Sequence, residues 1–567
     1  MFVLCALCGS VAQASALDRE AFSITNYDLN LQIEPDQHRL GVRGKIMVRN
    51  DSPTPQKIAV LQISSSLEWR AINAGDKPLQ IVTQPYASDI DHTGALSEAI
   101  VTLPQPVAPR GAIELEIAYE GVIVLDATRL TRIGTPVAAA LSSDWDQIST
   151  NFTGLRGAGY VAWYPIATGV ANLSESNSLF EVLGRWKARE ARSKMHLQVA
   201  ITKTASSGPP EVLFTGQKCS ASYEWEGMVQ RGVAECLDAI SRFDPPSLLI
   251  ANYQVLERRA IEVHYLRGND TFAAAYADEA DKVAPLITDW FGKLSAEAKT
   301  ADLPDAGAAP FESGAVLLTP LASTDSKLTG LAAAHQLTHA AFRSPRPWIN
   351  EGLAHFAQAL YLEHEKNRQA ALDYMGLHRS AFFEAEKPSG LPRSEDEANR
   401  SLVSTTSEEL YRSKAMSVWW MLRDMIGDEA LKKAIAAYRP EDDKEPSYMQ
   451  RMISAQTKRD LEWFFDDWVY RDRGLPDFKV ESVSSRQTLT GTYMVAVTIE
   501  NLGGAGAEVP VIVKSAGADA VRRLEVHAKS KATIRIEAPA PPTEAIVNDG
   551  SVPESDMTNN TFKVSSE

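Results

Sequence analysis

The stretch that most constrains the fold runs from Leu331 to Leu362 and carries two histidines four residues apart. His335 and His339 lie in an alanine-rich segment that favours a helix. Side chains at positions i and i+4 share one face of a helix, so both imidazoles are expected to point at the same place. Pro345 and Pro347 end this first helix, because proline cannot continue an internal helical turn.

A second helix is expected to begin at Trp348 and carries Glu351 in its first turn. Two histidines of one helix and a carboxylate of the next are the three protein ligands of a catalytic zinc, whose fourth position is left to water. The segment therefore predicts one zinc per chain, held by His335, His339 and Glu351. Two packed or surface histidines are the alternative interpretation. His355, four residues after Glu351, is either a hydrogen-bond partner of a ligand or a packed histidine.

Length and composition limit the architecture and the partners. A chain of 567 residues exceeds one hydrophobic core, so about three domains are expected. Its hydrophobic content of 44% and charged content of 23% are typical of a globular protein. The net charge of −16 argues against a nucleic-acid partner, which requires basic surface. The sequence has no apolar run of about 18 residues or more, so no transmembrane segment is expected.

The first residues, 1–16, have the pattern of the end of a signal peptide, with a short apolar run before small residues that suit cleavage. The chain is therefore expected to be exported, into a periplasm or the extracellular space. Cys5 and Cys8 would leave with this segment. The remaining Cys219 and Cys236 form an even pair, which in an exported protein predicts one disulfide. Two free buried thiols are the alternative.

The period of the apolar residues divides the rest of the chain. Between residues 17 and 258 apolar residues alternate with polar ones, as in Met195–Ile201, which predicts a β-rich N-terminal domain. Residues 259–476 are expected to be mainly helical, with a striped helix over Asp270–Leu294. Residues 477–567 alternate again and predict an antiparallel β-sandwich, immunoglobulin-like in pattern only. The expected fold is a multidomain α+β chain.

The histidine segment and its W-I-N-E-G string resemble the zinc site of the membrane alanine aminopeptidase family. These proteins are gluzincin metallopeptidases with a thermolysin-like catalytic domain, and the helical domain is expected to share that fold. The family carries H-E-x-x-H and then an N-E-G whose Glu is the third ligand, which implies His335, His339 and Glu351 here. The chain has HQLTH instead, and its spacer of eleven residues between His339 and Glu351 is shorter than is usual in the family.

The same resemblance implies roles for other residues. Gln336 stands where the family has its general-base Glu, and an amide has no basic site. Within Pro310–Leu321, expected to be an edge strand, Glu312 would bind the free amino terminus of a peptide; an exposed surface Glu is the alternative. Tyr411 stands where the family has a tyrosine that stabilises the tetrahedral oxyanion, the place where such a donor matters most. A packing tyrosine is the alternative.

In the family, zinc polarises the scissile carbonyl while the general base takes a proton from water. Losing such a base lowers the rate by about 10²–10⁴. The sequence therefore predicts an exported zinc metallopeptidase of the aminopeptidase type that acts on peptides, with activity reduced because of Gln336. The alternatives are a catalytically inactive homologue that holds zinc and binds peptides, and a structural surface protein whose site has decayed.

Overall fold

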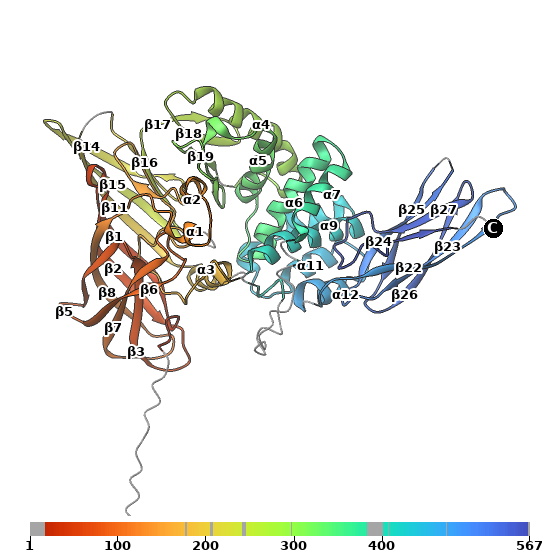
Figure 1. The fold of residues 1–567 in the computed structure, drawn as a ribbon, viewed down its shortest axis with the longest axis horizontal. Coiled ribbons are helices and arrows are strands. Elements are labelled where there is room, and N and C mark those ends of the chain that lie inside the picture. The colour runs from red at the N-terminus through yellow and green to blue at the C-terminus, as the bar shows by residue number, and fades with distance from the viewer. Residues whose placement is uncertain are drawn as a thin grey trace, which may run out of the picture.

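The computed structural model of the protein describes residues 17–564, except 176–177, 205–207, 241–244, 296, 381–382, 384–400, 406, 472 and 517. The chain runs from a β-rich part through a helical part to a second group of sheets near its C-terminal end (Figure 1). The predicted signal segment, residues 1–16, lies outside the described residues. In the part of the chain that is described, none of the helices has the length and the hydrophobicity that a membrane span requires.

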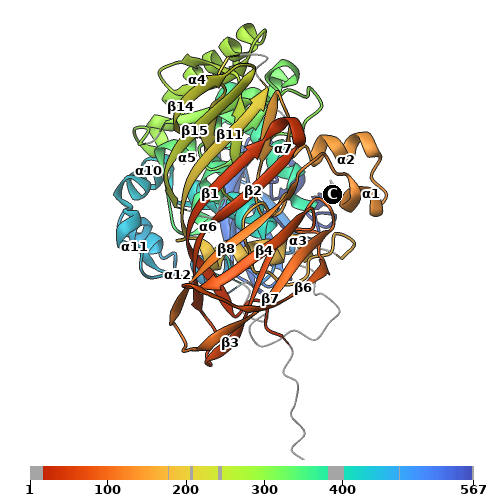
Figure 2. The ribbon, with the colours of Figure 1, turned by 90° about the vertical axis from the view of Figure 1, so that its left-hand side faces the viewer.

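An eight-stranded sheet dominates the β-rich part, and its strands lie side by side across the front of Figure 2. Its strand order is β14-β15-β11-β1-β2-β8-β4-β5, with all neighbours antiparallel except the parallel pair β1 and β11. Burial alternates along β1 with the expected period of two. The strands are β1 (Phe22–Glu34), β2 (Arg39–Asn50), β4 (Leu67–Ala74), β5 (Lys77–Pro78), β8 (Ala112–Val122), β11 (Lys194–Thr204), β14 (Ser220–Glu226) and β15 (Val229–Ile240).

Smaller sheets and short helices complete this part as described. A three-stranded sheet has the order β3-β7-β6 and a five-stranded sheet the order β13-β12-β16-β10-β9. Their strands are β3 (Gln56–Ser64), β6 (Gln80–Ala87), β7 (Ala95–Val107), β9 (Gln147–Ile148), β10 (Phe152–Leu155), β12 (Glu211–Phe214), β13 (Gln217–Lys218) and β16 (Leu248–Ala251). The helical segments are η1 (Pro35–Gln37), α1 (Thr128–Arg132), α2 (Val137–Ser143) and α3 (Ser178–Glu190).

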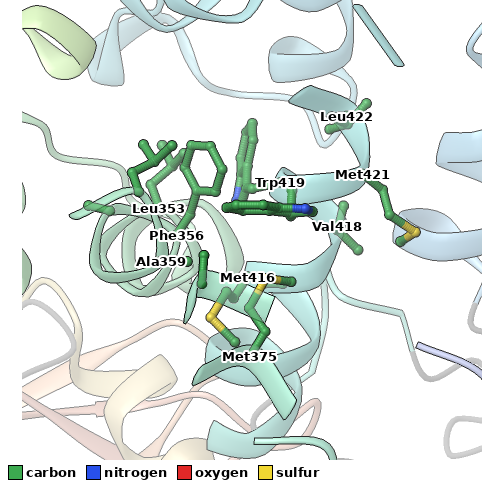
Figure 3. Close-up of a cluster of buried hydrophobic side chains, with 14 of the residues drawn as sticks. Leu353, Phe356, Ala359, Met375, Met416, Val418, Trp419, Met421 and Leu422 are labelled. Carbon is green, nitrogen blue, oxygen red and sulfur yellow. The ribbon is translucent and has the colours of Figure 1, made fainter. Parts of the chain in front are cut away.

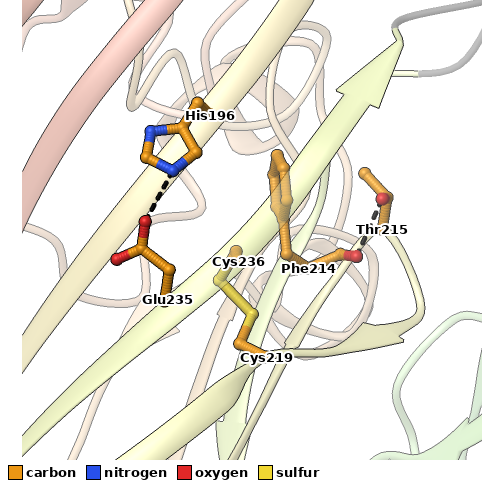
Figure 4. Close-up of a disulfide and its surroundings, with 6 residues drawn as sticks. All are labelled: His196, Phe214, Thr215, Cys219, Glu235 and Cys236. Atoms are coloured by element: carbon orange, nitrogen blue, oxygen red, sulfur yellow. Dashed lines mark hydrogen bonds and ion pairs between the residues drawn. A yellow bond between two sulfur atoms is a disulfide. The ribbon is translucent and has the colours of Figure 1, made fainter.

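A disulfide joins Cys219 and Cys236 in the β-rich part (Figure 4). Cys236 lies on β15, and Cys219 lies between β13 and β14, so the bond ties the smaller five-stranded sheet to the large sheet. Both residues are buried, with a Cα–Cα distance of 4.4 Å. The bond is therefore part of the core rather than of the surface.

A five-stranded sheet opens the helical part, in the order β17-β18-β19-β21-β20. Strand β17 lies before residue 258 and pairs with β18 after it, so the sheet crosses the expected domain boundary, which remains a prediction. The segment Pro310–Leu321 forms a hairpin whose first strand, β20, lies at the edge of the sheet. The strands are β17 (Tyr253–Glu257), β18 (Ile261–Leu266), β19 (Ala298–Asp302), β20 (Phe311–Ser313) and β21 (Val316–Thr319).

Helices build the centre of the molecule (Figure 1). The segment with the two histidines forms α5, which ends at Ala341, and α6 begins with Pro347 at its first position, where the missing N–H of proline breaks no bond. Segments η4 and η6 are π-helical turns. The segments are α4 (Asp270–Phe291), η2 (Leu321–Ser323), α5 (Ser326–Ala341), α6 (Pro347–Glu365), α7 (Arg368–Leu377), η4 (Glu409–Lys414), α9 (Ala415–Ile426), α10 (Asp428–Ala437), η5 (Pro440–Asp442), α11 (Tyr448–Ser454), α12 (Glu462–Phe465) and η6 (Asp466–Tyr470).

The core of this part is formed where α6 packs against α9 (Figure 3). The rings of Trp348 and Trp419 stack with centroids 5.2 Å apart, and the indole N–H of Trp419 donates to the carbonyl of Trp348 at 3.3 Å. Leu353 and Phe356 on α6 and Met416 on α9 are fully buried beside them. This packing fixes the first two turns of α6, which carry Glu351.

Two antiparallel sheets follow, one of order β22-β23-β26 and the other β25-β24-β27-β28. They face each other, and their buried side chains join the core of the helical part. The indole of Trp468 on η6 donates to the carbonyl of Gly506 at 2.7 Å, which also links the two parts. The strands are β22 (Phe478–Gln487), β23 (Tyr493–Asn501), β24 (Ala507–Ser515), β25 (Ala520–Val526), β26 (Lys531–Ala538), β27 (Pro542–Val547) and β28 (Thr561–Lys563).

Candidate metal centre

Helices α5 and α6 bring His335, His339 and Glu351 to one buried place, with ligand atoms that all lie within 4.8 Å of one another. The Nε2 atoms of the two histidines are 3.1 Å apart. One carboxylate oxygen of Glu351 lies 3.2 Å from Nε2 of His339, and the other lies 3.8 Å from Nε2 of His335. The short connection between α5 and α6 is therefore long enough for the three side chains to converge.

The donor set fits a zinc ion. Two imidazole nitrogens and one carboxylate are the ligands that a catalytic zinc takes from a protein. Burial lowers the pKa of His335 and so favours the neutral imidazole, which is the form that binds metal. The side-chain amide nitrogen of Asn350 lies 3.2 Å from Nδ1 of His339, and Nε2 of that ring faces the other two residues.

Electrostatics also keep Glu351 ready to act as a ligand. Although burial acts to raise the pKa of this carboxyl group, its contacts with His339 and Arg412 outweigh burial and hold the pKa well below the usual range. A carboxylate that stays ionised needs no deprotonation before it meets a cation. The group of three residues, called the triad below, could thus hold a divalent cation.

Glu312 lies beside the triad. It is on β20, and one of its carboxylate oxygens is 3.6 Å from Nε2 of His335. About a third of the side chain is exposed, at 31%. The edge strand predicted from the sequence thus directs this carboxylate to the histidine pair rather than to open surface.

Gln336 points into the sheet of the helical part. Its amide nitrogen donates to the carbonyl of Lys299 at 2.7 Å and to the carbonyl of Ala315 at 3.0 Å. The amide oxygen accepts from the hydroxyl of Tyr276 at 3.0 Å and interacts with Thr300. The side chain has no measurable exposure. These hydrogen bonds of its amide therefore hold α5 against β19 and the β20–β21 turn.

Tyr411 lies on the π-helical turn η4 and is almost fully buried, at 6% exposure. Burial, followed by the neighbouring Glu408 carboxylate, raises the pKa of its phenol well above the ordinary value. The phenol therefore keeps its proton at neutral pH and remains a hydrogen-bond donor.

Arg412 is a site residue that the sequence analysis missed. Its Nε lies 3.3 Å from a carboxylate oxygen of Glu351, and its Nη1 lies 3.2 Å from Glu408. Although burial acts to raise the pKa of Glu408, Arg412 and Lys187 hold it at about 2. The four-residue spacing of Glu408 and Arg412 was the available signal, because such a pair meets on one helix face.

His355 packs against the triad. Its ring lies edge-on to that of His335, with centroids 4.9 Å apart. Both of its ring nitrogens are buried and have no hydrogen-bond partner among the described residues. Of the two interpretations from the sequence, the structure has the packed histidine.

A cavity of about 740 Å³ lies between the β-rich part and the helical part. Glu312 and Arg412 line it on the helical side, and Tyr160 and Phe180 line it on the β-rich side. Most of the other lining residues are apolar, among them several leucines and prolines. A ligand in this cavity would therefore meet an apolar wall and a charged end beside the triad.

Neither protein-family models nor curated protein sequences gave a match to this chain. Among solved structures, the crystal structure of an M1 zinc metallopeptidase from Deinococcus radiodurans resembles the fold with a TM-score of 0.47 and 16% sequence identity, over 81% of this chain and 95% of that chain. A mutant of that protein gives a TM-score of 0.46 at 16% identity, over 81% of this chain and 96% of that one. Its complex with a Tyr-Ser-Ala substrate gives 0.46 at 15% identity, over the same shares.

Proposed function

We propose that the protein is an exported zinc metallopeptidase of the aminopeptidase type that acts on peptides with reduced activity. The observation that carries this proposal is the convergence of His335, His339 and Glu351 from two helices onto one buried point. Export is supported by the disulfide between Cys219 and Cys236, because such bonds persist in oxidising compartments.

Each residue beside the triad has a chemical task in this proposal. A bound zinc ion would supply a Lewis acid and lower the pKa of water. Glu312 would accept hydrogen bonds from the ammonium group of a peptide, since its carboxylate lies 3.6 Å from His335 at the cavity wall. The protonated phenol of Tyr411 would donate to the oxyanion that develops on the scissile carbonyl.

Reduced activity follows from Gln336 in two ways. An amide cannot take a proton from water, and this amide is also engaged by the carbonyls of Lys299 and Ala315. The same observation favours the second candidate function, in which the chain holds zinc and binds peptides without cleaving them. The two candidates share the triad and differ only in turnover.

Metal analysis tests the part that both candidates share. Purified protein equilibrated with zinc and then freed of excess metal should retain one equivalent per chain. His339→Ala should lose it, whereas His196→Ala on β11 should keep it, because His196 bonds to Asp28 and Glu235 on the large sheet. Full retention by His339→Ala would show that the triad does not hold the metal.

Turnover separates the two candidates. The zinc-loaded protein is incubated with a dipeptide that has a free amino terminus and with its N-acetylated form, and His339→Ala serves as the blank. Slow release of the amino acid from the free dipeptide alone supports an aminopeptidase. One equivalent of zinc without any release supports the peptide-binding homologue, and equal cleavage of both forms would exclude the aminopeptidase type.

A further inference from the structure

A row of alternating charges connects the triad to the β-rich part. Nζ of Lys187, on α3, lies 3.0 Å from one oxygen of Glu408. The other oxygen of Glu408 lies 3.2 Å from Arg412, and Nε of Arg412 lies 3.3 Å from Glu351. The row therefore runs cation, anion, cation, anion, and its last member is a ligand of the triad.

The contact at the end of the row is electrostatic rather than a hydrogen bond. Nε of Arg412 is buried and has no hydrogen-bond partner among the described residues, although an oxygen of Glu351 is 3.3 Å away. A guanidinium group does not lose its proton in proteins, so this positive charge is permanent. A metal ion and Arg412 would then draw on the same carboxylate and repel each other at short range.

We propose that Arg412, Glu408 and Lys187 are positioning residues that set the zinc affinity of the triad through alternating charge. The proposal rests on the zinc ligation proposed above. Arg412 weakens zinc binding because it competes for Glu351. Glu408 strengthens it, because it draws the charge of Arg412 away from the triad. Lys187 weakens zinc binding, because its ion pair with Glu408 reduces the attraction of Glu408 for Arg412.

The row crosses between two parts of the molecule. Lys187 belongs to a helix of the β-rich part, whereas the other three residues belong to the helical part. The side chains of Lys187, Glu408 and Glu351 are 11%, 16% and 12% exposed, so water screens their interactions only partly. Arg412 is 36% exposed, which limits the expected effects to moderate changes in affinity.

The test measures the zinc dissociation constant of the full chain by competition with a chromophoric chelator. Arg412→Met should tighten zinc binding by roughly tenfold, since it removes a cation near the metal. Glu408→Gln should weaken binding several-fold, and Lys187→Met should tighten it by a smaller factor. Arg368→Met is the matched control, because Arg368 also bonds to a carboxylate, that of Asp424, but belongs to a different contact.

A double variant makes the test independent of local packing. If Glu408 acts mainly through Arg412, then Glu408→Gln should weaken zinc binding by a clearly smaller factor when Arg412→Met is already present. Arg412→Gln provides a second neutral variant should the methionine variant fail to fold, as judged by circular dichroism.

The outcomes separate this proposal from the proposed function. Unchanged or weaker zinc binding in both neutral Arg412 variants would overturn the proposed role of the charge row. It would leave the triad as the proposed metal site. The same holds if Glu408→Gln weakens binding equally with and without Arg412. Zinc binding that survives His339→Ala would overturn both the proposed function and the proposed role of the charge row.

Discussion

The role of Gln336 in the fold differs from the role that its position in the sequence implies. In the sequence it lies between His335 and His339, the two proposed metal ligands, and the family resemblance implies that it takes the position of a general base. In the fold its side chain turns away into the sheet, where it donates to two backbone carbonyls and accepts from Tyr276. The residue therefore stabilises the contact between α5 and the sheet, and this role depends on a donor that glutamate lacks when ionised.

Gln336→Glu is expected to destabilise the protein rather than to restore a peptidase. A carboxylate would face the carbonyl oxygens of Lys299 and Ala315, so the variant loses two hydrogen bonds and about 1–3 kcal/mol of folding free energy. This environment raises the pKa of the introduced carboxyl group, because only its protonated form can donate. The loss should therefore be small at low pH and grow as the pH rises through that raised pKa.

Thermal unfolding of the variant and the wild type across pH 5 to 8 measures this effect. Gln80→Glu on β6 is the control, because Gln80 is exposed and should show no pH-dependent loss. A variant as stable as the wild type at pH 8 with a raised rate of dipeptide cleavage would mean that the side chain is free to serve the triad.

The contact between α6 and α9 depends on a glycine at the closest approach of the two helices. A Cβ at Gly352 would lie 2.7 Å from the Cβ of Ala415 and 3.0 Å from Nε1 of Trp419. Gly352 directly follows Glu351, so the same contact sets the position of this carboxylate.

Gly352→Ala is expected to destabilise the protein by about 1–3 kcal/mol, since the helices must move apart. Zinc affinity should fall as well, because α6 carries Glu351. Gly376→Ala in α7 is the matched control: no atom would meet its Cβ within 4 Å, so only the better helix propensity of alanine remains. Chemical denaturation of both variants gives the answer, and equal stability of the two would contradict the close contact.

Glu190, at the end of α3, is expected to make the stability of the protein depend on pH. It is fully buried, accepts from the backbone N–H of Ile24 and from Tyr27, and burial raises its pKa to about 7. The folded state therefore binds this proton more tightly than the unfolded state. Its contribution to stability is present at low pH and is lost as the pH rises from about 4.5 to about 7.

Glu190→Gln should abolish this loss, since a neutral amide does not titrate: its oxygen can accept from the N–H of Ile24, and its NH2 group can donate to the hydroxyl oxygen of Tyr27, which itself donates to the carbonyl of Pro165. Relative to the wild type, the variant should gain up to about 3 kcal/mol between pH 5 and pH 8. Calorimetric unfolding at several pH values provides the measurement. A constant difference between the two proteins at every pH would show that Glu190 titrates normally.

At the scale of the whole molecule, the oxidation state of the cysteine pair depends on the compartment in which the protein folds. The chain from residue 17 onward contains Cys219 and Cys236, whose sulfurs are bonded in the structure. On the proposal that the chain is exported and loses residues 1–16, the recovered protein should not react with a thiol reagent until it is reduced, and should then take up two equivalents. Two reactive thiols before reduction would contradict the prediction.

The same bond predicts a change in stability. It closes a segment of 17 residues in sequence, and removing it should lower the stability of the protein by about 3 kcal/mol. Replacing both cysteines with serine, compared with the wild type under reducing and oxidising conditions, measures this change. The serine variant should match the reduced wild type and fall below the oxidised one.

The sequence predicted those helices and strands whose formation depends on residues close together in the chain. Alternation in β1 and the helical spacing of His335 and His339 come from backbone periods of two and 3.6 residues, which neighbours in sequence determine. The start of α6 at Pro347 has an equally local cause, because proline fits the first position of a helix, where its missing N–H breaks no bond. The domain boundaries stay predictions, because the strand pair β17–β18 and the shared core near Trp468 continue across them.

Only the tertiary structure decided how these elements serve a site. The sequence alone predicted the two histidines and the carboxylate as candidate ligands and the helices that carry them, and its resemblance to a peptidase family implied a missing general base at Gln336. It did not place Arg412 against Glu351, Lys187 against Glu408, or the amide of Gln336 against Lys299. Those contacts join residues that are far apart in the chain, and they depend on how sheets and helices pack rather than on any local period. Packing therefore determines the charges and hydrogen bonds around the triad.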